Sequence, residues 1–163
     1  MYLFFFVLYR AAIYNSKYFI ITPAAHPFLH LTSRNTIVRL KNLDSAPNSV
    51  KDIDVFELIP SGQKFKITSH NGFDLCRTPE LKGRIKGCKN GDENARWSPT
   101  ITPDGILFRV GKLCLTATKM DTNPSNKGII LEARRCDSRK EQYFDLIPLK
   151  DFLPNFNNIF SFE

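Results

Sequence analysis

Cysteine and histidine are the residue types in this chain best suited to metal binding or nucleophilic catalysis, and their spacing favours neither role. The 163-residue chain has four cysteines and three histidines. No two cysteines have the Cys-x-x-Cys spacing of common zinc sites, and His26, His30 and His70 are scattered along the chain. No histidine stands in a pattern of serine, cysteine or carboxylate typical of a catalytic triad. We therefore predict no metal site, no cofactor and no enzymatic activity.

Basic side chains are the second group that could do chemistry, by binding anions. The formal net charge is +7 and the isoelectric point is about 9.3. Five cations crowd one short segment: Arg77, Lys82, Arg84, Lys86 and Lys89. Such a cluster can bind sulfated or acidic polysaccharides, although most charge clusters are simply solvated surface. Nucleic acid is not a predicted partner, because the cations lack interleaved aromatic residues on which bases could stack.

A sequence repeat distributes these residues over three related units. Each unit ends in a similar aromatic motif: DVFELIP at 54–60, ARWSP at 95–99 and QYFDLIP at 142–148. Its anchors Phe56, Trp97 and Phe144 are 41 and 47 residues apart. A second recurring segment precedes the aromatic motif in each unit, at 27–32, 73–78 and 111–116. A period of this length indicates one supersecondary unit used three times.

The elements of each unit are short strands. They are rich in β-branched and aromatic residues and are separated by turn residues, and no segment sustains a helical period. Units of this length cannot each bury a core, but three units around a pseudo-threefold axis can, and closing the sheet removes its edges. We predict an all-β fold, a β-trefoil of three four-stranded repeats at about 17–60, 61–101 and 102–149. The alternative is an all-β sandwich without repeats.

The cysteines follow the same register. Four cysteines allow three pairings. Cys76 and Cys88 occupy matched places in the second unit, and Cys114 and Cys136 occupy those places in the third. The first unit has His30 and Leu43 there. Cysteines that come and go in pairs are expected if each pair is bonded within its unit, which predicts Cys76–Cys88 and Cys114–Cys136. Disulfides in turn predict a secreted, extracellular protein.

The two ends of the chain are apolar. Residues 1–9 are almost all apolar, but a bilayer span needs about 20 such residues, so we predict no stable membrane span. A signal peptide over about 1–16 is expected, and the alternative is a retained segment packed on the domain. The tail at 150–163 is also apolar. We expect it to fold back over the domain, and the alternative is that it docks a partner.

These landmarks resemble those of the ricin B-type lectins. That family has three trefoil units, a disulfide inside each, and a Gln-x-Trp motif near the end of each. QYF at 142–144 is closest to the motif, ARW at 95–97 keeps the tryptophan, and DVF at 54–56 keeps only an aromatic residue. The resemblance covers about 17–149 and implies a β-trefoil that binds carbohydrate. Small secreted proteins of this type with eroded motifs also occur in microsporidian parasites.

The resemblance also implies a galactose pocket in each unit, and its residues have changed. The family places an aspartate two residues after the first cysteine, where this chain has Thr32, Thr78 and Thr116. It places an aromatic ring two residues before the second cysteine, where this chain has Lys41, Lys86 and Arg134. It places a glutamine two residues earlier, where this chain has Arg39, Arg84 and Glu132. Asn94 and Gln142 are the remaining matches to the family's asparagine and glutamine, in different units.

The predicted function follows from this comparison. The candidate binding residues are Thr78, Arg84, Lys86, Asn94, Thr116, Arg134 and Gln142. We expect a secreted ricin B-like carbohydrate-binding protein with eroded galactose sites and a preference for acidic glycans. The alternatives are a structural or protein-interaction trefoil of an extracellular wall or assembly, and a trefoil protease inhibitor that presents an exposed rigid loop. The expected partner is a glycan or an extracellular protein, and no oligomeric state is predicted.

Overall fold

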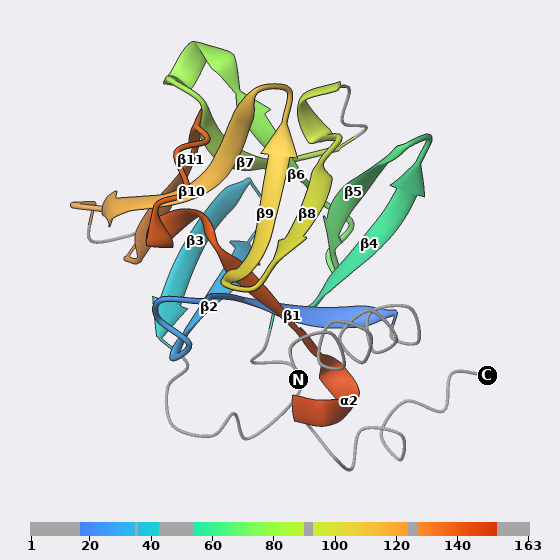
Figure 1. The fold of residues 1–163 in the computed structure, drawn as a ribbon. Helices are drawn as coiled ribbons and strands as arrows, with labels where there is room; N and C mark the ends of the chain where they lie inside the picture. The colour runs from blue at the N-terminus through green and yellow to red at the C-terminus, as the bar shows by residue number, and fades with distance from the viewer. Residues whose placement is uncertain (1–16, 35, 43–53, 90–92, 124–126, 153–163) are drawn as a thin grey trace.

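The computed structural model describes residues 17–34, 36–42, 54–89, 93–123 and 127–152, and these residues form an all-β protein (Figure 1). Twelve strands are seen in this part of the chain: β1 (Tyr18–Pro23), β2 (Leu29–Arg34), β3 (Ile37–Asn42), β4 (Phe56–Ser61), β5 (Lys64–Ser69), β6 (Asp74–Thr78), β7 (Arg84–Cys88), β8 (Ser98–Thr102), β9 (Gly105–Val110), β10 (Leu113–Met120), β11 (Ile129–Arg135) and β12 (Phe144–Pro148). The predicted all-β class is confirmed. Short 3-10 turns η2 (Pro79–Leu81), η3 (Glu93–Ala95) and η5 (Lys140–Gln142) and a final helix α2 (Leu149–Phe152) complete the described elements.

Six of the strands form a closed ring. β1 pairs with β4 and with β12, β4 pairs with β5, β8 pairs with β9, and β9 pairs with β12. The last gap, between β5 and β8, is closed by Phe65 and Trp97, whose backbone groups exchange hydrogen bonds of 2.8 and 2.7 Å. A ring of this kind has no free edge, so its backbone groups are paired within the molecule.

The other six strands are three hairpins that pair with one another. The hairpins are β2–β3, β6–β7 and β10–β11. The second strands of the three hairpins contact one another, because β3 pairs with β7 and with β11, and β7 pairs with β11. Each third of the chain therefore contributes two ring strands and one hairpin. We call β1–β4 the first unit, β5–β8 the second unit and β9–β12 the third unit.

The three aromatic anchors of the repeat lie in the shared core. Phe56, Trp97 and Phe144 are fully buried, and Phe144 packs against Phe108 with ring centroids 6.2 Å apart. Leucine and isoleucine from ring strands and hairpins fill most of the remaining core. Trp97 also donates from its indole Nε1 to the Leu75 carbonyl at 2.7 Å, so its polar atom is satisfied although the ring is buried.

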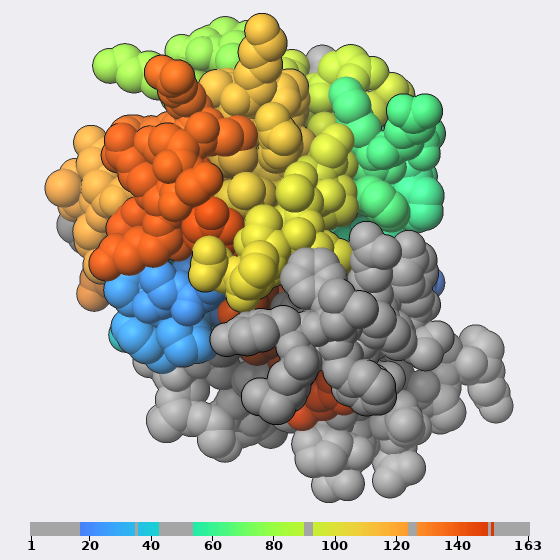
Figure 2. Space-filling view, in the orientation of Figure 1, coloured from blue at the N-terminus to red at the C-terminus, as the bar shows by residue number. Residues whose placement is uncertain are grey.

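The first and third units also contact each other beside β1 and β12. Ala24, after β1, donates its backbone N–H to the Tyr143 carbonyl at 2.9 Å, and in Figure 2 the blue surface of the first unit lies against the orange surface of the third. On the opposite side of β1 from the core, Ile20 packs with Val55 and with Leu149 of α2. Leu149, the last residue of the predicted third repeat, is thus packed on the domain, while 153–163 of the predicted tail lies outside the described residues.

Both predicted disulfides are present. Cys76 is bonded to Cys88 and Cys114 to Cys136, with Cα–Cα distances of 6.0 and 5.0 Å. In the first unit, His30 takes the place of the first cysteine and is buried. Leu43, at the place of the second, lies outside the described residues, as do the predicted signal segment 1–16 and most of the tail.

Glycines allow neighbouring hairpins to approach closely. Gly83, in the turn before β7, has a φ of +78° and its carbonyl accepts from the Ala133 N–H at 2.7 Å. A Cβ on Gly83 would lie 2.8 Å from the Ala133 carbonyl oxygen. Gly128 is similar, since its Cβ would lie 2.6 Å from the Leu40 carbonyl oxygen. Both positions therefore need glycine for conformation and for space.

The variant Gly83→Ala tests this packing. It adds a Cβ against the backbone of β11, so we expect it to lower the free energy of unfolding by more than the roughly 1–2 kcal/mol that a left-handed alanine costs on its own. The matched control is Gly62→Ala, which has a φ of +66° but no atom within 4 Å of the added Cβ. Urea unfolding of both variants measures the difference, and equal losses would contradict the close approach.

Candidate functional site

The three hairpins bring the sequence-predicted site residues together in one repeated arrangement. The threonine of each unit lies directly opposite a charged residue: Thr32 opposite Arg39, Thr78 opposite Arg84, and Thr116 opposite Glu132. The next outward pairs also correspond: His30 with Lys41, Cys76 with Lys86, and Cys114 with Arg134. Directly opposite residues project from the same face of a hairpin, so each unit places a threonine beside charged residues.

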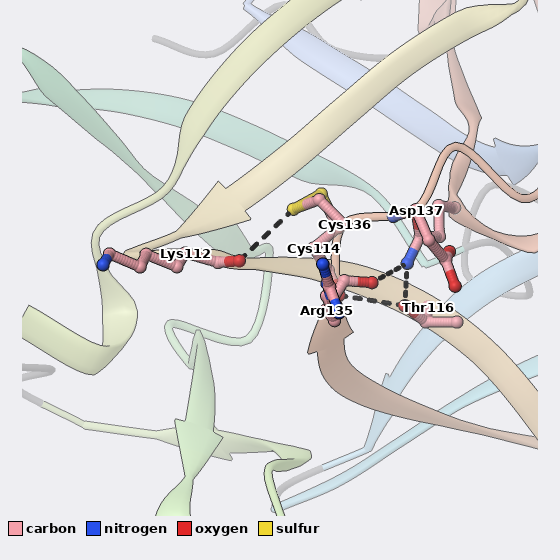
Figure 3. The surroundings of a disulfide bond; sticks show 7 residues. Lys112, Cys114, Thr116, Arg135, Cys136 and Asp137 are labelled. Carbon is pink, nitrogen blue, oxygen red and sulfur yellow. Dashed lines mark hydrogen bonds between the residues drawn. A yellow bond between two sulfur atoms is a disulfide. The ribbon is translucent and has the colours of Figure 1, made fainter.

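In the third unit, the polar atoms of the site bond to one another. Gln142 is buried, and its amide nitrogen donates to Thr116 Oγ1 at 3.2 Å and to the Arg135 carbonyl at 2.7 Å (Figure 3). Its amide oxygen accepts from the Asp137 N–H at 3.0 Å. The Thr116 hydroxyl donates to the Cys114 carbonyl at 2.9 Å. Both donors of Gln142 and the donor of Thr116 are therefore used in holding the loop after β11 beside the disulfide.

The cation of the third unit is paired as well. Arg134 is exposed, and its Nε donates to Glu132 Oε2 at 2.8 Å while a terminal nitrogen lies 2.7 Å from the same oxygen. Glu132 is thus the partner of Arg134 within one strand, two residues apart on the same face. Glu132 therefore offsets the charge of Arg134 on this face of the hairpin.

In the first unit, the arginine is buried. The Thr32 hydroxyl donates to the Arg39 carbonyl at 3.1 Å. Arg39 donates from Nε to Asp121 Oδ2 at 3.0 Å, forms a second and shorter bond to that oxygen, and donates to the Val38 carbonyl at 2.6 Å. The Asn123 backbone N–H and the Arg39 guanidinium both lower the pKa of Asp121, so this carboxylate stays charged beside Arg39.

Sequence reasoning did not identify Asp121 as a partner, because it lies 82 residues from Arg39 in another unit. No local pattern marks it, since the contact exists only where the loop after β10 meets β3. Arg39 is therefore part of a buried ion pair between two units.

The second unit differs from the other two. Thr78 is partly exposed, and its hydroxyl makes no capping bond to the turn η2 that follows it. Among the described residues, no carboxylate lies within 4 Å of a charged nitrogen of Arg84 or Lys86. Asn94 lies in η3 and has a partner of its own. Ala95 is buried at the place that Gln142 holds in the third unit.

Asp54 takes the place of Gln142 in the first unit. It is 8% exposed, and burial raises the pKa of its carboxyl, opposed in decreasing order by the charges of His70, Arg34 and His30 and by a backbone hydrogen bond from Ser33. The histidines are scattered along the sequence, as expected. In the folded structure, however, His30 and His70 both lie close enough to Asp54 for their charges to act on its carboxyl. Across the part of the chain that is described, no group of three potential ligands could hold a metal ion.

Comparison with known proteins identifies the fold. No family model matches the chain, and no curated protein matches its sequence. The designed threefold-symmetric protein ThreeFoil is similar, with a TM-score of 0.62, 13% identity, and coverage of 80% of this chain and 97% of that one. This likeness shows a shared fold with a protein built from three repeats.

Larger proteins contain similar domains. A mosquitocidal holotoxin matches with a TM-score of 0.66 and 13% identity, covering 82% of this chain and 16% of the toxin. A Polyporus squamosus lectin, in complex with a sialylated epitope, matches with a TM-score of 0.58 and 11% identity, covering 80% of this chain and 48% of the lectin. Glycosidases are also among the similar structures, and the chain spans about a third of them. Within the described residues, no helix is long and apolar enough to cross a membrane.

The variant Gln142→Ala separates a structural role from a binding role. It leaves the Asp137 N–H, the Arg135 carbonyl and the Thr116 hydroxyl without their buried partner, so we expect a loss of about 2–3 kcal/mol in unfolding free energy. Arg134→Gln, at an exposed ion pair, is the control and should change stability by less than about 1 kcal/mol. Chemical denaturation measures both, and an unchanged stability of Gln142→Ala would refute the structural role.

The variant Asp54→Asn tests the buried carboxyl. Because the pKa of Asp54 is raised by folding, the folded state binds its proton more tightly, and this contribution to stability falls as pH rises from the ordinary aspartate pKa through the raised pKa. We expect Asp54→Asn to be more stable than the wild type at pH 7, with a difference that shrinks under acid conditions. Urea unfolding from pH 4 to 7 measures this, and a less stable variant at pH 7 would contradict it.

Proposed function

We propose that the chain is a secreted, non-catalytic β-trefoil that binds carbohydrate through altered ricin B-type sites and favours acidic glycans. The observation that carries the proposal is the repeated arrangement of threonine and charged residues at one register in all three hairpins. These positions match, residue by residue, the places that hold galactose in the family that the sequence resembles. The likeness to microsporidian secreted proteins belongs to the same proposal.

A preference for acidic glycans follows from the changes at these positions. A threonine hydroxyl can hydrogen-bond a sugar but lacks the charge of an aspartate, and lysine or arginine offers no ring face for stacking. The same cations attract carboxylate or sulfate groups. The similar Polyporus squamosus lectin was solved with a sialylated, hence acidic, epitope, which supports testing this class of ligand.

Secretion is supported by the disulfides. Two bonds join all four cysteines of the chain. Disulfides persist in oxidising compartments and are rare in the cytosol. The predicted signal segment at 1–16 would provide the route, and it lies outside the described residues.

A non-catalytic role fits the residues that could act as nucleophiles. All four cysteines are bonded, so none is a free thiol. Ser33, whose backbone N–H bonds to the carboxyl of Asp54, is 1% exposed, which keeps its hydroxyl away from a substrate. Ligand binding needs no such nucleophile, and the exposed hairpin faces suit it better.

A second candidate is a protein-interaction or structural trefoil that no longer binds sugar. It is favoured by the internal bonding of Thr32, Thr116 and Gln142, whose polar atoms serve the fold. On this alternative, the retained residues reflect packing alone, and the partner is an extracellular protein.

A glycan array that carries neutral, sialylated, uronate-containing and sulfated glycans tests the proposal. The expected result is binding to acidic glycans, with weak or no binding to galactose and lactose. Equilibrium binding in solution should then confirm the array hits, because dense arrays can amplify weak attraction. An absence of binding to every glycan class would overturn the proposal and favour the protein-interaction candidate.

A further inference from the structure

The three hairpins have different numbers of cations available for a ligand. In the third unit, Arg134 is paired with Glu132, and in the first unit Arg39 is buried against Asp121. The first unit keeps Lys41, opposite the buried His30, and Arg34 at the far end of the hairpin, whose charge acts on the buried Asp54. At the register positions beside the threonine, the arginines of these two hairpins, Arg39 and Arg134, are therefore neutralised by carboxylates within the protein.

The second hairpin keeps two cations on one face. Ile85 is fully buried in the core, so Arg84 and Lys86 project from the opposite face of β7. Residues two apart in a strand are about 7 Å apart, which lets two long side chains converge on one anionic group. Thr78 lies opposite Arg84 on the same face.

The nearest carboxylates do not neutralise this pair. Glu132 lies opposite Arg84 across β7 and β11, and Arg84 helps to lower the pKa of Asp121, so both carboxylates are close. Each is already bonded to another arginine, Glu132 to Arg134 and Asp121 to Arg39. The described part of this surface thus contains two satisfied ion pairs and two surplus cations, Arg84 and Lys86.

Two further features complete a surface that suits a sugar. Thr78 is partly exposed and its hydroxyl does not cap the following turn, so it can donate to a ligand oxygen. Ile37 lies opposite Lys86 on β3 and is 40% exposed, which adds an apolar contact next to the charged group. A sugar ring has both hydroxyls and apolar C–H faces, and this combination matches both.

We propose that the second unit alone carries the ligand site, in which Arg84 and Lys86 bind one sulfate or carboxylate group of an acidic glycan and Thr78 bonds a neighbouring oxygen. This inference rests on the proposed function and narrows it to one site per chain. Charge-assisted hydrogen bonds to Arg84 and Lys86 provide most of the affinity. The hairpins of the first and third units contribute no equivalent site.

The test measures binding of a sulfated heparin hexasaccharide and a carboxylated hyaluronan hexasaccharide to the full chain by calorimetry. We expect a stoichiometry of one. In the double variant Arg84→Gln/Lys86→Gln, affinity should fall by about ten-fold or more, since each 1.4 kcal/mol of lost interaction is ten-fold. Heparin carries carboxylates as well as sulfates, so binding of heparin alone indicates that the site takes sulfate. Binding of both hexasaccharides indicates that it takes carboxylate, and either result supports the site.

The matched control is Arg109→Gln/Lys112→Gln, which removes the same charge from exposed positions in β9 and the turn after it. It should leave affinity within about two-fold, because only the general field of the protein changes. Thermal unfolding of each variant confirms that the fold is retained, and Thr78→Val gives an independent, smaller loss of affinity without any change in charge.

Other outcomes would overturn the inference, and they separate it from the proposed function. Equal losses in the two double variants, a stoichiometry of three, or binding to lactose alone would refute the site in the second unit while leaving carbohydrate binding intact. Equal affinity for a single-stranded DNA oligonucleotide would show charge attraction without a glycan site. Binding to no glycan would overturn the proposed function together with this site.

Discussion

Shared burial holds this protein together, because no third of the chain can bury its own apolar face. The core cluster runs from Phe19 in β1 to Leu146 in β12 and includes residues of all three hairpins. Removing such surface from water is the main favourable term in folding, and here it is available only when the three units assemble. The backbone bonds between Phe65 and Trp97 close the ring, and Gly83 and Gly128 let the hairpins meet. The assembly of the three units therefore provides both the buried core that stabilises the protein and its threefold arrangement.

The same constraint shapes the candidate site. Equivalent places in the three units hold Asp54, Ala95 and Gln142, all buried, and each solves a different local problem. Gln142 ties a loop to its hairpin through three hydrogen bonds, Ala95 fills space, and Asp54 is a buried carboxyl near two histidines. Symmetry of the backbone thus does not produce symmetry of function. In the first and third units, polar residues at the positions of the candidate ligand site bond to other groups of the fold. The second unit keeps its cations facing outward.

Much of the fold could be predicted from sequence because of the repeat. It marks equivalent positions that are far apart along the chain, and each can be recognised from a few neighbouring residues. The aromatic motif identified Phe56, Trp97 and Phe144 as the anchors of the repeat, and all three are fully buried. The matched cysteines predicted both disulfides, and the threonine and cation positions lie opposite each other as the repeat alignment requires. The long-range neighbours of Arg39 and Arg84 could not be predicted from the sequence. Arg39 and Asp121 lie in different units, and the approach of Arg84 to Glu132 depends on how β7 and β11 pair.

The sequence by itself therefore determined the strands, their threefold grouping, the cysteine pairing and the set of charged residues on the hairpins. These properties depend on periodicity and composition, which act along the chain. Only the tertiary structure decided which cations are neutralised and which remain available. For Arg39, that outcome depends on a contact between units, in which the carboxylate of Asp121 in the third unit reaches an arginine of the first. Arg39 is buried against Asp121, Arg134 is held by Glu132, and Arg84 and Lys86 are left facing outward because the nearby carboxylates are already bonded.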